Sequence, residues 1–333
     1  MKRCTLCVMP ETYPGIAFDS EGVCSFCRKQ NGKNFVPSLS KLQAKLDEII
    51  RECKAQNRKY DALVAYSGGK DSTFLIHTLK EKYGLRMLAV TLDNGFMSEA
   101  SFINMRKVLN RLNVDHTIVR PRYDLMKQIF LQSSAPEVYP THLTQFGSGI
   151  CISCIRIVTN MCLRVAIEKG IPMVMLGNSP GQLIQSENEI LFQDNKIPYE
   201  LRKNLFKPLA ERVGDDVYTY LMLDKDEYRT NPFPYTINAF PIIGYQEDEI
   251  YRTIRELGWT KPEDVDPNST NCRLNSLGIV KHKQVHRFHP YDFEMSLLVR
   301  QGIITREEAL KRVEDPEEKA LRLAEQVEEQ LLS

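Results

Sequence analysis

The sequence predicts an α/β protein built on a doubly wound parallel sheet, with a small cysteine-rich ribbon before the sheet and a helical segment after it. Short apolar runs alternate with amphipathic stretches from residue 61 to residue 176, which is typical of βαβ units. Two Cys-x-x-Cys pairs stand within the first 30 residues, and helical periodicity dominates after residue 290. At 333 residues, the chain can bury one large core with small additions.

The composition is that of an ordinary globular protein. Hydrophobic residues make up 42% of the chain and charged residues 26%, and the net charge of +1 gives no overall attraction to nucleic acid or membranes. No uninterrupted apolar run approaches the roughly 20 residues that span a bilayer. Met1-Lys2-Arg3 leads directly to Cys4, without the apolar stretch of a secretory signal. We therefore expect a cytoplasmic protein without a membrane partner.

Four cysteines near the N-terminus form two pairs, Cys4-x-x-Cys7 and Cys24-x-x-Cys27, with 16 residues between them. Each pair can direct two thiolates at one centre, and the turn residues between the pairs suit a short ribbon held by a metal ion. We therefore expect a structural Zn²⁺ site in a zinc ribbon over residues 1–33. An iron–sulfur site and a pair of disulfides are the alternatives.

The elements that follow the ribbon are expected in a regular order. A helical pattern over 34–60 is interpreted as a linker helix. Strands are expected at 61–66, 86–92, 114–119 and 171–176, with helices over 72–83 and 98–112. Residues 183–236 break the alternation, so we interpret them as an insertion that shapes an acceptor pocket or covers it as a lid. This gives an α/β domain over 61–290 and a helical C-terminal segment over 291–333.

The strongest functional signal follows the first strand, in the stretch Ser67-Gly68-Gly69-Lys70-Asp71-Ser72. Two glycines let the backbone approach an anion, and the start of the next helix supplies unpaired N–H groups and the positive end of its dipole. The hydroxyls of Ser67 and Ser72 and the ammonium group of Lys70 complete a site for a polyphosphate. The spacing is that of neither a Walker A loop nor a dinucleotide-binding turn. An ordinary glycine turn is the alternative.

This stretch resembles the signature of the PP-loop ATP pyrophosphatase superfamily, whose members bind the pyrophosphate of ATP and transfer AMP to a carbonyl oxygen. The resemblance implies a HUP-like sheet and a site for ATP and Mg²⁺, in which Asp71 orients the loop or the Mg²⁺. It also implies nucleotide contacts near Asp93 and Gly177, which follow two other strands. The match at Gly177 is partial: several relatives place an acidic residue a few positions later, where this chain has Ser179-Pro180-Gly181-Gln182. A turn residue that ends a strand is the alternative for Asp93.

Three further cysteines follow the loop at a distance. Cys151-x-x-Cys154 stands about 80 residues after it, and Cys272 lies far downstream. The arrangement resembles that of the tRNA thiolases of the same superfamily. The resemblance implies that Cys151, Cys154 and Cys272 bind a [4Fe-4S] cluster with one iron free of protein ligands, and that they take part in sulfur transfer. A zinc site or redox pair of Cys151 and Cys154, and a purely structural role, are the alternatives.

Both ends of the chain resemble a different family, the N-acetyl sugar amidotransferases. Residues 4–12 with 22–24, and residues 303–310, carry this resemblance. It implies that nitrogen from a partner glutaminase replaces an acetamido oxygen. No domain-sized part of the chain remains for a glutaminase, so ammonia would come from a separate partner.

The two resemblances share the first half-reaction, in which ATP adenylates a carbonyl oxygen of the acceptor and pyrophosphate leaves. We favour sulfur transfer because three cysteines have a direct chemical use in it. A basic segment over 281–289 suggests a third class, an RNA-binding zinc-ribbon module, although a solvated surface is the simpler interpretation.

The partners follow from the same reasoning. The low net charge favours a small molecule or a sugar nucleotide over tRNA as the acceptor. A glutaminase or a sulfur donor is the expected protein partner, and the superfamily resemblance implies a homodimer. We expect the pocket residues in 120–150 and 183–240.

Overall fold

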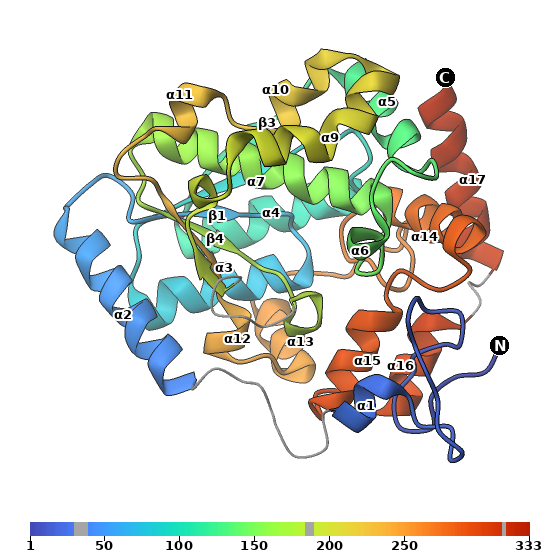
Figure 1. Ribbon diagram of the computed structural model, residues 1–333. Helices are drawn as coiled ribbons and strands as arrows, with labels where there is room; N and C mark the ends of the chain where they lie inside the picture. Colours follow the sequence, from blue (N-terminus) through green and yellow to red (C-terminus); the bar gives the residue numbers. More distant parts are fainter. Residues whose placement is uncertain (30–38, 184–189, 315–317) are drawn as a thin grey trace.

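The computed structural model describes residues 1–29, 39–183, 190–314 and 318–333 (Figure 1). In these residues the strands form a six-stranded sheet in the order β3-β2-β1-β4-β6-β5. Every neighbouring pair is parallel except β5 with β6 at one edge. The strands are β1 (Ala62–Ala65), β2 (Met87–Leu92), β3 (Asp115–Val119), β4 (Met173–Leu176), β5 (Leu191–Phe192) and β6 (Tyr235–Asn238). The α/β class with a doubly wound parallel sheet is confirmed.

Helices cover both faces of the sheet, because successive strand residues point to opposite sides. Leu63 of β1 belongs to one core cluster and Val64 to the other. The first face is covered mainly by α5 (Tyr123–Ser133), α7 (Gly149–Lys169), α9 (Tyr199–Val213), α10 (Tyr218–Leu221), α14 (Leu274–His286) and α17 (Glu318–Leu332). The second is covered by α2 (Leu39–Ala55), α3 (Lys70–Tyr83), α4 (Glu99–Leu112), α12 (Phe240–Ile243) and α13 (Glu247–Glu256).

The strand order places a ligand site between β1 and β4. The chain runs outward from β1 through β2 to β3, and then returns to the other side of β1 as β4. In open α/β sheets, ligands bind at the carboxyl ends of strands where the order reverses in this way. The Ser67–Ser72 stretch follows β1, and Gly177 follows β4, so both lie at this point.

Residues 183–236, which break the alternation of strands and helices, contain both helices and strands in their described part. Residues 190–236 form β5, α9, α10, α11 (Lys225–Tyr228) and the short 3₁₀ turns η2 (Asp194–Lys196) and η3 (Asp215–Val217). Their helices pack on α5 and α7. β6 begins inside this segment and is not indicated by the sequence, because Pro232 and Pro234 precede a strand of only four residues and give the signal of a turn.

The N-terminal ribbon lies beside one part of the C-terminal segment (Figure 1). The N-terminal ribbon, which includes α1 (Ser25–Lys29), lies beside α15 (Asp292–Arg300) and α16 (Arg306–Val313) in Figure 1. Tyr13 and Phe26 of the ribbon contact the ring of Phe293 in α15. The last helix, α17, instead packs on α14 and α5 of the sheet domain. The expected boundary near residue 33 lies outside the described residues, and the described part of the linker region, α2, packs on the sheet domain.

One helix of the described residues, α7, is long and apolar enough to cross a membrane by length and composition. In this structure it packs against α5, α10, α14 and the sheet. Its apolar composition is therefore explained by core packing.

Candidate functional site

The loop Ser67–Ser72, the predicted phosphate-binding loop, joins β1 to α3 and is held in a fixed shape. Gly68 has a φ of +69°, and a Cβ there would lie 2.9 Å from the carbonyl oxygen of Ser101, so only glycine fits without displacement. The hydroxyl of Ser72 accepts a hydrogen bond from the amide of Ser67 at 3.2 Å. The indole of Trp259 donates to the carbonyl of Gly68 at 2.9 Å. These contacts thus hold the loop and the start of α3 in a defined orientation.

Lys70 stands at the first position of α3, and its charge is already neutralised within the protein. Its Nζ lies 2.7 Å from Asp71 Oδ1 and 3.3 Å from Glu247 Oε1, and it donates to the hydroxyl of Tyr245. Burial lowers the pKa of Lys70, but Asp71, Tyr245 and Glu247 outweigh it and hold the pKa well above its usual range. Lys70 is therefore an ammonium group at neutral pH.

The two other predicted nucleotide contacts differ in their surroundings. A Cβ on Gly177 would lie 3.4 Å from the backbone of Ser72, so the end of β4 directly contacts the start of α3. Asp93 instead forms an ion pair with Arg120 at 2.6 Å and accepts a hydrogen bond from the amide of Gly95. The structure therefore brings Gly177 to the loop and uses Asp93 in a turn.

A cavity of about 550 Å³ opens beside the loop. Asp71 lies on its wall, and so do Cys151, Cys154 and Cys272. The other walls come from α7, the insertion, the loop before α14 and α15, and include Leu143, Phe146, Arg156, Leu205, Phe206, Thr270, Asn275, Tyr291 and Glu294. The pocket residues expected in 120–150 and 183–240 thus contribute part of the wall. The rest comes from Asp71, from residues 151–182 and from residues beyond 240.

The three cysteines of the cavity come from two places in the chain. Cys151 and Cys154 lie in the first turns of α7, and Cys272 lies in the loop before α14, where a β-bridge pairs it with Met97. The side-chain amide of Asn94 lies 3.6 Å from the sulfur of Cys154 and 3.9 Å from that of Cys272. Within the described residues, these sulfurs do not form a group close enough for a single ion, since only the N-terminal cysteines do. Three thiols around one cavity at a wider spacing suit a cluster better than one metal ion.

The protonation of these thiols is set by burial. Burial raises the pKa of Cys151 to about 12 and raises the pKa values of Cys154 and Cys272 as well. A thiol whose pKa is raised in this way is a weak nucleophile at neutral pH. The surroundings therefore disfavour a free catalytic or redox pair, whereas bound metal would favour the thiolate form.

The four N-terminal cysteines form a compact buried group. Their sulfur atoms all lie within 4.8 Å of one another, with 3.7 Å between Cys7 and Cys24 and 3.9 Å between Cys4 and Cys27. Tetrahedral coordination with metal–sulfur bonds of about 2.3 Å requires separations of roughly 3.8 Å. The guanidinium of Arg306 in α16 donates to the carbonyl oxygens of Cys4 and Cys7, so the C-terminal segment supports this group. The arrangement fits a single four-sulfur metal site.

Two residues of the site could not be found from local patterns. Glu294 lies on the cavity wall in α15, where the hydroxyl of Ser179 donates to its Oε1 at 2.5 Å. Burial, together with the nearby Asp71, raises the pKa of Glu294 to about 7. Trp259, which holds Gly68, stands 191 residues from it in the chain. The sequence gives no signal for such distant contacts, although Trp259 is the only tryptophan.

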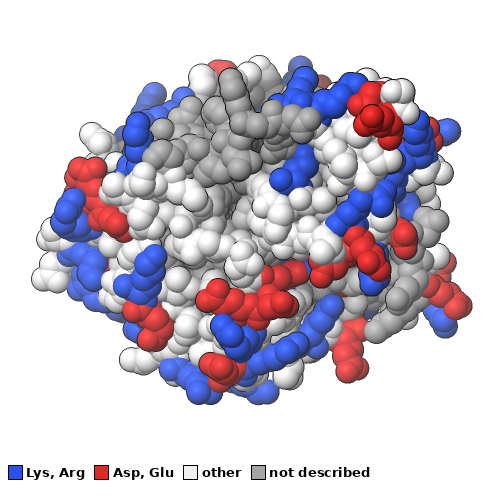
Figure 2. All heavy atoms as spheres, turned by 90° about the horizontal axis from the view of Figure 1, so that it is seen from below, with Lys and Arg blue, Asp and Glu red and all other residues white. Residues whose placement is uncertain are grey.

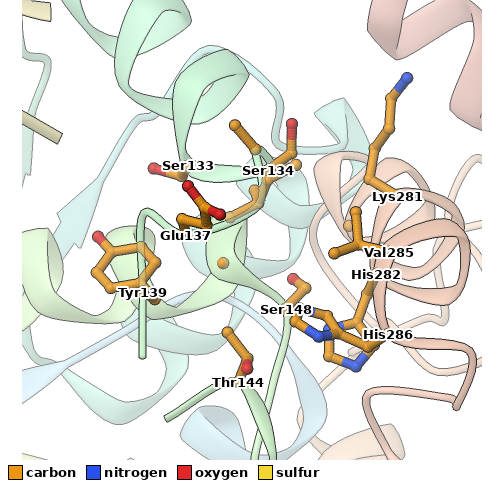
Figure 3. A pocket seen from close by; sticks show the side chains of 14 residues that line it. Ser133, Ser134, Glu137, Tyr139, Thr144, Ser148, Lys281, His282, Val285 and His286 are labelled. Atoms are coloured by element: carbon orange, nitrogen blue, oxygen red, sulfur yellow. The ribbon is translucent and has the colours of Figure 1, made fainter. Parts of the chain in front are cut away.

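The basic segment 281–289 is partly packed and partly exposed, with Gln284, Val285 and Arg287 at the surface. Lys281 pairs with Glu328 of α17 at 2.5 Å, and Phe288 is buried in the core of the ribbon. His282 is only 4% exposed and faces a small cavity of about 20 Å³ between α5, α7 and α14, beside His286 and Ser148 (Figure 3). Elsewhere, Figure 2 shows lysines and arginines interspersed with acidic residues on the face seen from below. The packed residues of this segment therefore have a structural role.

Comparisons with known proteins give similarity along most of the chain. No protein-family model matches it. The chain is 24% identical over 316 residues to an uncharacterized protein of Methanocaldococcus jannaschii, which covers 94% of each chain. It is also 24% identical over 241 residues to one of the subunits of the glutamine-hydrolyzing GMP synthase of Methanococcus maripaludis, or 71% of this chain and 74% of that one.

Solved structures with a similar course of the chain include two proteins. One is the U34-tRNA thiolase NcsA of Methanococcus maripaludis with its [4Fe-4S] cluster, with a TM-score of 0.37 and 16% identity over 94% of this chain and 90% of that one. The other is the NMN synthetase of Francisella tularensis, with a TM-score of 0.36 and 12% identity over 88% of this chain and 94% of that one.

Proposed function

We propose that the chain is an ATP-dependent enzyme of the PP-loop type, which adenylates a carbonyl oxygen of an acceptor and replaces that oxygen with sulfur. The order of the strands and the loop before α3 support this proposal. The observation that carries the proposal is the shared cavity. Asp71 beside the phosphate-binding loop and the thiols of Cys151, Cys154 and Cys272 line the same space of about 550 Å³. An acceptor bound there would lie next to both the proposed ATP site and the three thiols.

The loop residues act on ATP in the first half-reaction. Backbone amides at the start of α3 and the hydroxyls of Ser67 and Ser72 would stabilise the departing pyrophosphate. The acceptor oxygen attacks the α-phosphorus, the bond from that phosphorus to the bridging oxygen breaks, and pyrophosphate leaves. Asp71 lies on the wall of the cavity, where a carboxylate can bind Mg²⁺ together with phosphate oxygens.

The three cysteines fit an iron–sulfur cluster better than a single ion. Their sulfurs are too far apart for one ion, and the three residues are half-buried and line the cavity. When bound, a [4Fe-4S] cluster with three cysteine ligands would leave one iron available to sulfide. The protein itself would hold the adenylated acceptor in the cavity and keep water from its activated carbon by the apolar walls of Phe146, Leu205 and Phe206.

The four N-terminal cysteines have a structural role in this proposal. Their sulfur separations and full burial favour Zn²⁺, which would fold a ribbon too short to build its own core. The residue range 1–33 remains our proposed boundary for this unit.

Nitrogen transfer is the second candidate, favoured by one specific observation. The chain is similar over 71% of its length to a separate subunit of a glutamine-hydrolyzing synthase. Ammonia from a partner glutaminase would then replace the acceptor oxygen after the same adenylation. In both cases we propose a small molecule or a sugar nucleotide as the acceptor, because the net charge is +1 and the basic segment 281–289 is partly packed.

The test measures AMP released from ATP labelled at the α-phosphate. N-acetyl sugars, sugar nucleotides and unmodified tRNA are supplied in turn as acceptors, with sulfide or ammonium ion as the nucleophile. We expect AMP formation that needs sulfide and is lost in Cys151→Ala. The Asp71→Ala variant serves as the control that abolishes the first half-reaction.

The other outcomes separate the candidates. Release of AMP that needs ammonium ion and survives Cys151→Ala would replace sulfur transfer by amidination. Absence of AMP with every acceptor and nucleophile, together with absence of ATP binding, would contradict an ATP-dependent enzyme altogether.

A further inference from the structure

We propose that Glu294 of α15 binds Mg²⁺ together with Asp71, so that the C-terminal segment completes the nucleotide site. The inference rests on the proposed function, because it requires ATP at the phosphate-binding loop. It concerns a residue that lies 223 positions from Asp71 in the chain and is brought to it only by the fold.

Glu294 and Asp71 lie on the walls of the same two spaces. Both line the large cavity with the three cysteines, and both line a neighbouring cavity of about 250 Å³ that also contains Lys70. The two cavities meet at these carboxylates, on the side of the start of α3 where the phosphates of ATP are expected. The fold therefore places two oxygen-donating side chains from opposite ends of the domain beside one ligand.

Glu294 forms no ion pair among the described residues, and the cation that acts on it at longer range is Lys70. Lys70 is engaged by Asp71 and Glu247, and Arg312 is engaged by Glu247. A polyphosphate would add further negative charge next to Glu294 and Asp71, and like charges at such short range repel. A divalent cation between them removes the repulsion, and Mg²⁺ is typically bound by one or two carboxylates together with phosphate oxygens.

The position of Glu294 is fixed from two sides. On one side, Ser179 in the turn after β4 donates a hydrogen bond to Glu294 Oε1. A Cβ on Gly181 would lie 2.7 Å from the Cγ of Glu294, so this glycine allows α15 to approach the turn. On the other side, Arg3 of the ribbon forms a 2.6 Å ion pair with Asp292 of α15. The carboxylate is thus held at the cavity.

The turn after β4 contributes a hydroxyl group to this contact. Its described residues include Ser179 and Gln182 and no acidic residue. Ser179 instead orients a carboxylate that arrives from α15. The negative charge of the site is present, but a different part of the chain supplies it.

The test measures the Mg²⁺ dependence of nucleotide binding, without turnover. ATP binding to the full chain is titrated by calorimetry at a series of Mg²⁺ concentrations, and Mn²⁺ bound in the presence of ATP is counted by electron paramagnetic resonance. In Glu294→Gln, we expect the gain in ATP affinity from Mg²⁺ to fall by roughly tenfold or more, with no loss of the affinity measured without metal. Glu307→Gln, an exposed change of the same charge on α16, should behave as wild type.

A second variant keeps the inference testable if Glu294→Gln fails to fold. Ser179→Ala leaves the carboxylate in place but removes the hydrogen bond that orients it, so it should lose part of the Mg²⁺ dependence. An unchanged Mg²⁺ dependence in both Glu294→Gln and Ser179→Ala would overturn the inference while leaving the proposed function intact. Failure of the wild-type chain to bind ATP at any Mg²⁺ concentration would overturn both.

Discussion

His282 is a buried imidazole whose two ring nitrogens lack a hydrogen-bond partner among the described residues. Burial, together with the neighbouring His286, lowers its pKa to about 3. Because the unfolded chain has a histidine pKa near 6.5, the unfolded state binds more protons between about pH 6.5 and pH 3. Neutral His282 is therefore compatible with the fold above pH 6.5, and stability is lost as the pH falls below that value.

The substitution His282→Gln tests this titration. We expect the free energy of unfolding of the wild type to fall below pH 6.5 more steeply than that of the variant, by at most about 1.4 kcal/mol per pH unit. Urea denaturation at pH 7.5, 6.0 and 5.0 would measure the free energy of unfolding of both proteins. The contributions of all other titrating groups cancel in the difference between them. If the free energies of unfolding of the two proteins fell in parallel with pH, His282 would be protonated in the folded state as readily as in the unfolded chain, which would contradict its lowered pKa.

Single residues also show which parts of the site the sequence can reveal. The stretch from Ser67 to Ser72 is contiguous and owes its chemistry to local backbone shape, so it can be recognised directly. Glu294 and Trp259 act through contacts with residues more than 100 positions away. Asp93 has a local role as well, because its Oδ1 accepts a hydrogen bond from the amide of Gly95 in the turn after β2, and its contact with a nucleotide stays a prediction.

The first turn of α7 determines where two of the cavity cysteines lie. A Cβ on Gly149 would lie 2.0 Å from the carbonyl oxygen of Ser133 at the end of α5, a contact that requires backbone movement. We expect Gly149→Ala to lower the free energy of unfolding by roughly 2 kcal/mol or more and to reduce bound iron, because Cys151 would be displaced. Chemical denaturation and iron analysis would measure the two effects.

Gly147→Ala is the matched control for this prediction. It lies two residues earlier, and a Cβ there would have no neighbour within 4 Å. It should leave both stability and iron content close to wild type. Equal effects of the two substitutions, or no effect of either, would contradict the packing of α7 against α5.

At the level of elements, the strength of the local pattern decided what could be predicted. β1 to β4 all lie within two residues of the expected ranges. β1, β2 and β4 are apolar runs of four to six residues with turn signals around them, whereas β3 is half-exposed and its position came from the alternation. β6 has only four residues after two prolines, and its place in the sheet depends on pairing with β4. Tertiary contacts therefore outweigh local signals there.

The molecule as a whole connects the N-terminal ribbon to the nucleotide site through α15. The ribbon contacts one end of this helix through Arg3 and Phe26, and the turn after β4 contacts the same helix at Glu294. The hydroxyl of Tyr13 also donates to the carbonyl of Gln145, next to a residue of the cavity wall. Such contacts between chain ends lie beyond any local sequence pattern.

Loss of the proposed ribbon metal should therefore weaken nucleotide binding, although no residue of the proposed nucleotide site is changed. We expect Cys7→Ser to lower the affinity for ATP in the presence of Mg²⁺ by several-fold, because α15 loses its support on one side. Calorimetric titration would measure it. Cys53→Ser, a change at a buried cysteine of α2 outside the ribbon, is the control. Wild-type affinity in a Cys7→Ser protein that has lost its zinc would contradict this coupling.

The central claim is that one molecule contains two different cysteine sites, a four-sulfur ion site in the ribbon and a three-cysteine cluster site in the ATP-binding cavity. The most direct test is the iron, sulfide and zinc content of the full chain purified without oxygen, with its absorption spectrum. We predict about four iron, four sulfide and one zinc per chain, with iron and sulfide lost in Cys272→Ala and zinc retained. One zinc without iron or sulfide would contradict the cluster and make amidination the better account of the cavity.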